Sequence, residues 1–399
     1  MTQLNLNFNL KRALLVPLLS PLFLFLAGRI RVLSLAYFNA AGRMPRHANF
    51  TSSEVKFADR IRSCEDVVLI ESLSLALLAC DPGRETWNTV MGVFTAGPKP
   101  EPNAELYAYN YSSSTLSDSE SLKPINLVGF NSELRSLGLE YHEPSSTLFI
   151  ANHGHQGSRI EQFHLDLDTL TATHKHTLTH PLIRSPNSIT ALSASEFFFT
   201  NQHYFTARDS PRILWALETY LALPIASIVH ARVLSNGSLS ASVVAHQAYP
   251  NGIALFNEST LAVASTNKRL VYFYSIARDP KHSHPTLQPS STLWLPFLPD
   301  NLSISKADGA LLIAGHPHLP SLNQYAHSRA LCNRDGEAES VCASINTASW
   351  ASEWTPSGGL QHIYADWTYP SSASVVRDRE KGVGIVAGLY ANGILVWRD

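Results

Sequence analysis

The sequence carries little charge and almost no excess of either sign. Charged residues make up 16% of its 399 residues, and 30 basic against 32 acidic side chains leave a formal net charge of −2. Domains that bind nucleic acid usually carry a basic face or stripe. The composition therefore gives no reason to expect a nucleic-acid partner.

Cysteine is also scarce, and none of the four cysteines has a CxxC spacing. A zinc site built on cysteine is therefore not expected. Cys332 and Cys342 flank a polar stretch and are predicted to close a local disulfide loop in an oxidising compartment. Cys64 and Cys80 can pair as well, although the sequence alone does not fix this connectivity.

No apolar run reaches the length of a comfortable membrane-spanning helix. The run ALLVPLLSPLFLFLAG at 13–28 is interrupted by Pro17 and Pro21 and falls short of the roughly 20 residues that such a helix needs. Lys11 and Arg12 precede it, which is typical of a signal peptide or an uncleaved signal anchor. Residues 1–40 are therefore predicted to send the chain into the secretory pathway, as a cleaved signal or as an anchor that associates with a membrane. A buried helix is the alternative interpretation.

Asn-X-Ser/Thr sequons agree weakly with entry into that pathway, because such matches also arise by chance. Glycosylation is predicted at four positions, namely Asn49, Asn110, Asn236 and Asn257. A fifth sequon begins at Asn301.

Helical periodicity is nearly absent beyond residue 60 and is visible only in ILWALETYLAL at 213–223. The segment 208–224 is expected to cover the site, to rest on a membrane, or simply to pack as a surface helix.

Elsewhere, short apolar or alternating runs are separated by Gly, Pro, Asn, Asp and Ser, as in all-β folds. No Pro/Ser-rich linker divides residues 41–399, and the roughly 335 residues after Cys64 suit six blades of about 40–50 residues each. The prediction is an all-β, six-bladed β-propeller in one domain.

A short phrase returns three times, each time at the start of a predicted strand. It reads RSPNSITAL at 184–192, AYPNGIALF at 248–256 and FLPDNLSIS at 297–305. In a propeller, the starts of the innermost strands converge on one end of the central channel, so the Asx residues of the phrase would meet there. Amide and carboxylate oxygens are the ligands that calcium prefers. The phrase predicts a calcium site, with ordinary Asx turns before strands as the alternative.

The chain from about Cys64 onward resembles the serum paraoxonase/arylesterase family, and its N-terminal segment resembles that of fungal members. The family consists of six-bladed propellers with calcium in the central tunnel. The matching stretches, which follow one another in the same order, are CEDVVLI (64–70), LFIANH (148–153), PNSITAL (186–192), FFTNQHYF (198–205), LETYL (217–221), PNGIALF (250–256), PDNLSIS (299–305) and AGHPH (314–318).

The resemblance implies a ligand set for a catalytic calcium ion. Its members are Glu65, Asn187, Asn251, Asp300 and Asn301. Asn301 is then expected to be buried and to carry no glycan.

The family's second, structural calcium would use Asp66 and the backbone carbonyl near Leu139. Its third position, an aspartate in the family, is Ser188 in this chain. The loss of a carboxylate is expected to weaken this second ion, or to leave its place to water or another group.

The resemblance also implies a calcium-dependent hydrolase of aryl esters or lactones, in which the ion polarises the carbonyl and stabilises the oxyanion. Leu137 stands where the family has a proposed histidine base, so a His–His dyad is not available. His153 matches a second family histidine, and water is expected to be activated by His153 or Glu65. His203 and His316 match further histidines near the tunnel, where they can act as supports of the site.

Two other functions stay open. A dry tunnel next to Leu137 would suit a cyclase, isomerase or eliminase acting on a natural product. A calcium-stabilised binding module without turnover is the other alternative, and the five-ligand set weighs against it.

Overall fold

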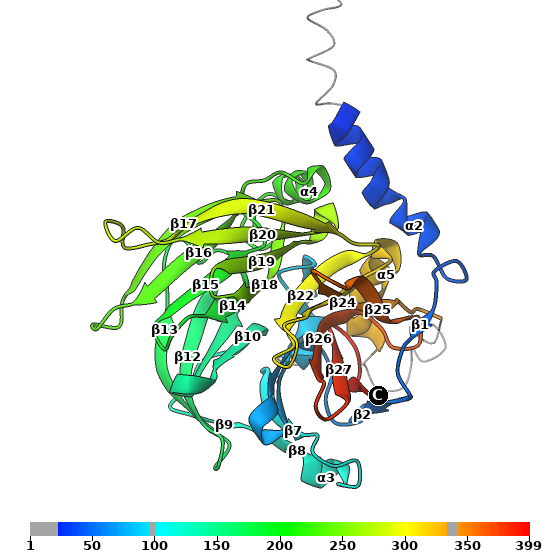
Figure 1. Cartoon of the computed structure of the whole chain (residues 1–399), viewed down its shortest axis with the longest axis horizontal. Coiled ribbons are helices and arrows are strands. Elements are labelled where there is room, and N and C mark those ends of the chain that lie inside the picture. The colour runs from blue at the N-terminus through cyan, green and yellow to red at the C-terminus, as the bar shows by residue number, and fades with distance from the viewer. Residues whose placement is uncertain (1–22, 96–100, 333–341, 343) are drawn as a thin grey trace, which may run out of the picture.

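The computed structural model describes residues 23–95, 101–332, 342 and 344–399, which form six sheets of four or five strands and one short two-stranded ribbon. The sheets fan out around a common axis as the blades of a propeller (Figure 1). The predicted all-β, six-bladed β-propeller is confirmed.

In each blade the strands follow one another from the tunnel axis outward. Blade 1 contains β3 (Cys64–Ile70), β4 (Leu75–Cys80), β7 (Glu105–Asn110) and β8 (Leu122–Pro124). Blade 2 contains β10 (Ser136–His142), β11 (Thr147–Asn152), β12 (Arg159–Asp166), β13 (Thr171–Leu178) and β9 (Asn126–Val128). Blade 3 contains β14 (Pro186–Ala191), β15 (Glu196–Asn201), β16 (Ala226–Val233) and β17 (Leu239–Gln247).

The remaining three blades follow the same plan. Blade 4 contains β18 (Pro250–Asn257), β19 (Thr260–Ser265), β20 (Leu270–Ala277) and β21 (Thr286–Trp294). Blade 5 contains β22 (Leu298–Ile304), β23 (Leu311–His316), β24 (Ser349–Thr355), β25 (Gly359–Asp366) and β1 (His47–Ala48). Blade 6 contains β26 (Ser372–Asp378), β27 (Val383–Gly388), β28 (Ile394–Arg398) and β2 (Ser52–Lys56). The ribbon pairs β5 (Trp87–Asn88) with β6 (Val93–Phe94).

The propeller is closed by its N-terminal part. Strand β2 pairs antiparallel with β28 and becomes the outermost strand of blade 6, while β1 adds to β25 of blade 5. Six apolar clusters lie between neighbouring blades, one for each of the six contacts around the ring. The six sheets stay separate, and the edges of their innermost strands are short and protected where they meet at the axis.

Helices are few, and α3 (Asp118–Ser121) lies apart from the others beside the outer strands of blade 1 (Figure 1). Residues 23–33 are helical, and the other helices are α2 (Leu35–Phe38), α3 (Asp118–Ser121), α4 (Arg212–Leu221) and α5 (Leu319–Cys332). Single 3₁₀ turns are η1 (Glu71–Leu73), η2 (Pro82–Glu85), η3 (Glu143–Ser145) and η4 (Thr266–Lys268). The helical expectation at 213–223 is confirmed by α4, whereas α5 was not predicted, because its apolar residues do not gather on one face.

The predicted apolar segment lies only partly within the described residues. Its first ten residues, 13–22, fall outside them, and its last six belong to the helix at 23–33. Among the described residues, no helix has both the length and the apolar character to cross a membrane. The division into residues 1–40 and 41–399 stays a prediction.

The predicted disulfide is confirmed, and a second one forms between the two cysteines whose pairing the sequence left open. Cys64 pairs with Cys80 across β3 and β4, and Cys332 pairs with Cys342 after α5. Of the sequon asparagines, Asn301 is buried as expected, and Asn49, Asn236 and Asn257 lie on the surface. Asn110 is half-buried. Glycosylation itself stays a prediction.

The innermost strands share an irregularity that explains the repeated phrase. In all six, the pairing register shifts near the axis, as between Pro186 and Ile189, Pro250 and Ile253, and Pro299 and Leu302. A bulge of this kind re-aims side chains that regular alternation would send elsewhere. The proline is the first or second residue of the strand, the Asx residues occupy the bulge, and the aliphatic residue resumes the ladder.

Close approach of the strands at the axis also depends on two glycines. A Cβ on Gly138 would lie 2.1 Å from the carbonyl oxygen of Asn187, and one on Gly252 would lie 2.5 Å from that of Asp300. Any larger residue would push these strands apart. The glycines after Leu137 and Asn251 therefore help to bring the site residues together.

Candidate metal centre

Four of the five predicted calcium ligands line a single cavity at one end of the central tunnel. Glu65 comes from β3, Asn187 from β14, Asn251 from β18 and Asp300 from β22. Asn301 lies beside them and donates a hydrogen bond of 2.9 Å from its Nδ2 to Glu65 Oε1. Residues far apart in the sequence thus meet because each begins an innermost strand.

The three asparagines are oriented in the same sense. Each amide nitrogen donates a hydrogen bond: Asn187 to Gln202 Oε1 at 2.6 Å, Asn251 to Thr266 Oγ1 at 3.0 Å, and Asn301 to Glu65. Their three Oδ1 atoms and Oε2 of Glu65 are buried without any hydrogen-bond partner within the described part of the chain. Buried polar atoms normally find partners, so four orphaned oxygens in one place call for a ligand.

The carboxylates of the centre are held close together away from water. Burial raises the pKa of Glu65 well above its ordinary value, and the nearby carboxylates of Asp66 and Asp300 raise it further. Like charges crowded in a dry site disfavour ionisation unless a cation offsets them.

These donors fit a hard divalent cation. In the described ranges, no three His, Cys, Asp or Glu residues gather closely enough to hold a metal. The centre instead combines two carboxylates with three amide oxygens, which is the donor mixture of calcium rather than of zinc. The orphaned oxygens thus fit the ion that the resemblance implies.

The expected second ion finds a poorer site. Asp66 Oδ2 accepts a hydrogen bond of 2.8 Å from the backbone N–H of Leu139, and its Oδ1 accepts bonds from Val67 N and Ser374 Oγ. Both oxygens of Asp66 are therefore already satisfied by the protein. With Ser188 in place of a carboxylate, no donor set comparable to that around Glu65 forms among the described residues at this position.

The cavity above the centre has a volume of about 410 Å³ and mostly apolar walls. The innermost strands β10 and β22 contribute Leu137 and Leu298 to these walls. Val90 and Met91 come from the turn of the ribbon between β5 and β6, and Leu389 follows β27. Helices α4 and α5 contribute Trp215 and Leu322, and the helix at 23–33 contributes Phe25, Leu26 and Leu33 to the rim. The site is a polar floor beneath an apolar shaft.

The predicted base His153 does not line this cavity. It is buried, its Nε2 lies 2.5 Å from the carbonyl oxygen of Pro186, and its Nδ1 lies 2.6 Å from Thr89 Oγ1. Because the carbonyl can only accept, Nε2 carries the proton and Nδ1 accepts from the hydroxyl, so neither nitrogen has a free lone pair. Burial lowers the pKa of His153 to about 4. Its catalytic role stays a prediction that this geometry does not favour.

His316 is better placed. It lines the cavity, its Nε2 lies 2.8 Å from Asp300 Oδ2, and its Nδ1 is buried without a partner in the described parts of the chain. The Asp300 carboxylate fixes the tautomer that leaves the Nδ1 lone pair free. His203, by contrast, lies 2.8 Å from Thr219 Oγ1, and burial lowers its pKa to about 3. The sequence indicates His316 only as a support of the site, because no motif reveals which ring nitrogen is free.

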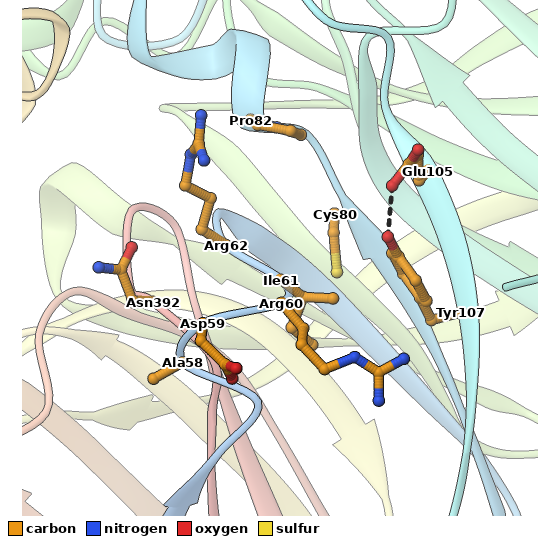
Figure 2. A pocket seen from close by; sticks show the side chains of 10 residues that line it. All are labelled: Ala58, Asp59, Arg60, Ile61, Arg62, Cys80, Pro82, Glu105, Tyr107 and Asn392. Carbon is orange, nitrogen blue, oxygen red and sulfur yellow. Dashed lines mark hydrogen bonds between the residues drawn. The ribbon is translucent and has the colours of Figure 1, made fainter. Parts of the chain in front are cut away.

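Other cavities hold none of the catalytic-calcium residues. One, of about 480 Å³, lies further along the innermost strands than Glu65 and includes Asp66, Leu139 and Ser188 together with Glu140, whose pKa burial raises to about 8. Another, of about 200 Å³, opens between blade 1 and residues 58–62. Figure 2 shows this second cavity with Arg60 and Arg62 along it, and with Tyr107 donating a hydrogen bond to Glu105.

Comparison with known proteins finds relatives of this chain. The sequence model of the family described as arylesterase matches residues 124–331. Serum paraoxonase/arylesterase 2 from Canis lupus familiaris is 30% identical over 203 residues, which cover 48% of this chain and 51% of that protein. Serum paraoxonase/lactonase 3 from Oryctolagus cuniculus is 29% identical over 184 residues, covering 45% and 47%. The matched region thus spans about half the length of these relatives.

Solved structures resemble the chain more remotely. A periplasmic gluconolactonase from Pseudomonas aeruginosa is 14% identical, covers 82% of this chain and 93% of its own, and has a TM-score of 0.44.

Proposed function

Since this chain belongs to the serum paraoxonase/arylesterase family, we propose that it is a calcium-dependent hydrolase of aryl esters or lactones. The observation that carries the proposal is the set of four orphaned oxygens, from Glu65, Asn187 and Asn251 at the floor of an apolar cavity and from Asn301 beside them. A floor of this kind can hold a cation against the carbonyl of a substrate whose apolar part contacts the walls.

Calcium would be held by Glu65, Asn187, Asn251, Asp300 and Asn301. When bound, it supplies positive charge that polarises an ester carbonyl and stabilises the developing oxyanion. We propose a single ion, because the oxygens of Asp66 are already satisfied and Ser188 offers no carboxylate.

The sequence suggests His153 or Glu65 as the base that activates water, and the geometry favours His316 instead. Nδ1 of His316 accepts a proton from water as the water oxygen bonds to the carbonyl carbon and the carbonyl π electrons move onto oxygen. Asp300 keeps the opposite nitrogen protonated and stabilises the resulting imidazolium. When the tetrahedral carbon collapses, the C–O bond to the leaving group breaks and His316 returns the proton to the departing oxygen.

The shape of the cavity favours neutral substrates with an apolar part. Leu137, Trp215 and Leu389 offer no partner for a charged or strongly polar group, apart from the indole N–H of Trp215. An aryl ester or a lactone with an alkyl chain would bury its apolar part along these walls and leave its carbonyl at the polar floor.

Non-hydrolytic chemistry is the second candidate, and one observation favours it. Leu137 is buried in the apolar cluster between blades 2 and 3 and also lines the cavity. The position at which the family has a proposed histidine base is therefore apolar in this chain. A cyclase, isomerase or eliminase would benefit from excluding water. A binding module without turnover gives no reason for a base such as His316 with a free lone pair.

The proposal is tested by hydrolysis of phenyl acetate and a panel of lactones, first with calcium and then with a chelator. Activity that disappears with the chelator and returns with calcium is the expected result. If calcium-loaded protein hydrolyses none of these substrates, the result contradicts the hydrolase proposal and favours the non-hydrolytic candidate.

We further propose that the protein follows the secretory pathway and contacts a membrane next to the tunnel mouth. The two disulfides agree with an oxidising compartment. The helix at 23–33 exposes Leu24 and Ile30, and α4 exposes Ile213 and Tyr220 beside it. Arg29 ties the two regions together, because its Nη2 donates a 2.7 Å hydrogen bond to Asn267 O and its Nη1 reaches Tyr220 O. Such a patch suits the headgroup boundary of a bilayer.

Replacing both Leu24 and Ile30 with glutamate is expected to lower partition onto phosphatidylcholine vesicles by roughly 10-fold or more, because each apolar side chain contributes on the order of 1.5 kcal/mol when buried. Co-sedimentation with vesicles measures this. Leu73→Glu, at an exposed leucine in η1, is the matched control and should bind as the unaltered chain does. Equal partition of all three proteins would rule out this patch as the membrane contact.

A further inference from the structure

One polar group in the cavity is used by none of the roles above. Tyr249 lines the cavity beside Asn251 and Asp300. Its hydroxyl makes no hydrogen bond to any of the described residues, whereas the buried tyrosines Tyr111 and Tyr274 donate to Asp378 and Gln247. A phenol that lines the cavity without a partner is a free donor next to the candidate metal centre.

The backbone holds this side chain in an unusual way. Tyr249 has a φ of 47°, in the left-handed region that a bulky residue seldom adopts. Its carbonyl accepts a bond from Thr266 N, the residue whose hydroxyl orients Asn251. Its ring meets that of His203 edge-on, at 4.6 Å between centroids and 73° between planes. Ser63 and Ser371, which precede the innermost strands of blades 1 and 6, have the same left-handed backbone, so this turn belongs to the entry into the strand and fixes where the ring of Tyr249 starts.

The placement also follows from the repeated phrase. Tyr249 precedes Pro250 and Asn251, so the turn into β18 places the phenol and the amide oxygen at the same end of the tunnel. The corresponding residues before the other two repeats are Ser185 and Leu298. Only the repeat of blade 4 therefore carries an aromatic hydroxyl at this point.

We propose that Tyr249 is a catalytic residue that donates a hydrogen bond from its hydroxyl to the carbonyl oxygen of the ester or lactone and holds it as that oxygen becomes negative. The inference rests on the proposed function. The phenol keeps its proton throughout, so it stabilises charge without transferring a proton. Donors aimed at a developing oxyanion act strongly in a site that excludes water.

The test compares Tyr249→Phe with the unaltered chain in two measurements. The first is hydrolysis of an apolar lactone, where kcat is expected to fall about 100-fold with little change in KM. The second uses ligands that are not hydrolysed, a lactam and the cyclic ether of the same size and alkyl tail. The unaltered chain is expected to prefer the lactam, and Tyr249→Phe to lose about 5-fold of that preference, as for one neutral hydrogen bond.

Tyr204→Phe is the control, since Tyr204 is exposed and lies outside the cavity. Calcium content and the thermal midpoint of all proteins should be equal, which separates a donor from a merely structural ring. Unchanged kcat together with an unchanged lactam preference in Tyr249→Phe would overturn the inference and leave the hydrolase proposal standing. A chain that hydrolyses nothing, yet loses its lactam preference with Tyr249→Phe, would support the donor and overturn the hydrolase proposal.

Discussion

Glu65→Gln is expected to lower calcium affinity by on the order of 100-fold and to reduce ester hydrolysis by at least as much. Charge count is a principal determinant of calcium affinity, and Glu65 supplies one of only two carboxylates at the centre. Glutamine has the same shape and keeps an oxygen in place, so the change removes charge rather than packing. Initial rates at fixed calcium and a calcium titration measure the two effects.

The same variant should behave differently once calcium is removed. Glu65 is buried, and Asp66 and Asp300 are close enough to raise its pKa further. An uncompensated buried carboxylate costs several kcal/mol, so Glu65→Gln in chelator should unfold at a higher temperature than the unaltered chain. Glu258→Gln, in the exposed turn after β18, is the control for both measurements. A variant that keeps normal activity and affinity would show that Glu65 is not a ligand.

His316→Gln is expected to lower kcat by about 10²- to 10⁴-fold, the usual contribution of a general base. The glutamine amide can still donate to Asp300, so the calcium content should not change, and only the free lone pair at Nδ1 is lost. Single-turnover rates, together with metal analysis of the same sample, make the measurement.

His153→Gln is the informative comparison, because the resemblance assigns the base to His153 while both of its ring nitrogens are engaged by Pro186 and Thr89. We expect His153→Gln to lower the thermal midpoint of the protein and to change kcat much less than His316→Gln does. A correctly folded His153→Gln whose kcat is lowered by about 10²- to 10⁴-fold would show that His153 is the base.

Much of the fold followed from the sequence because the signals are local. Short apolar runs with regular turn residues predict strands, and the length per blade gives six of them. Helix α5 was missed because its residues Leu322 and Tyr325 are buried by packing against the propeller, without a clear amphipathic period. The closure by β1 and β2 was also not predicted, since pairing between the two ends of a chain leaves no local pattern.

The metal centre was predictable as a set of residues but not as a geometry. The repeated Pro-Asx phrase and the family resemblance named Asn187, Asn251 and Asp300, and the structure explains the phrase through register shifts at the axis. The engaged nitrogens of His153 and the satisfied carboxylate of Asp66 depend on partners from other parts of the propeller, and the free nitrogen of His316 depends on how its ring meets Asp300 within blade 5. Tyr249 carried no sequence signal beyond its place before a proline, because a positive φ on tyrosine cannot be read from residue type.

The most direct test of the calcium hydrolase is one assay on one preparation, with bound metal and hydrolysis of phenyl acetate and apolar lactones measured together. Metal-free protein should be inactive, and activity should return as calcium is added and saturate at one ion per chain, with Asn251→Ala remaining inactive throughout. Hydrolysis that is unaffected by complete removal of calcium, or that proceeds normally in Asn251→Ala, would contradict the assignment of the orphaned oxygens to a catalytic ion. Saturation at two ions would contradict the single-ion centre.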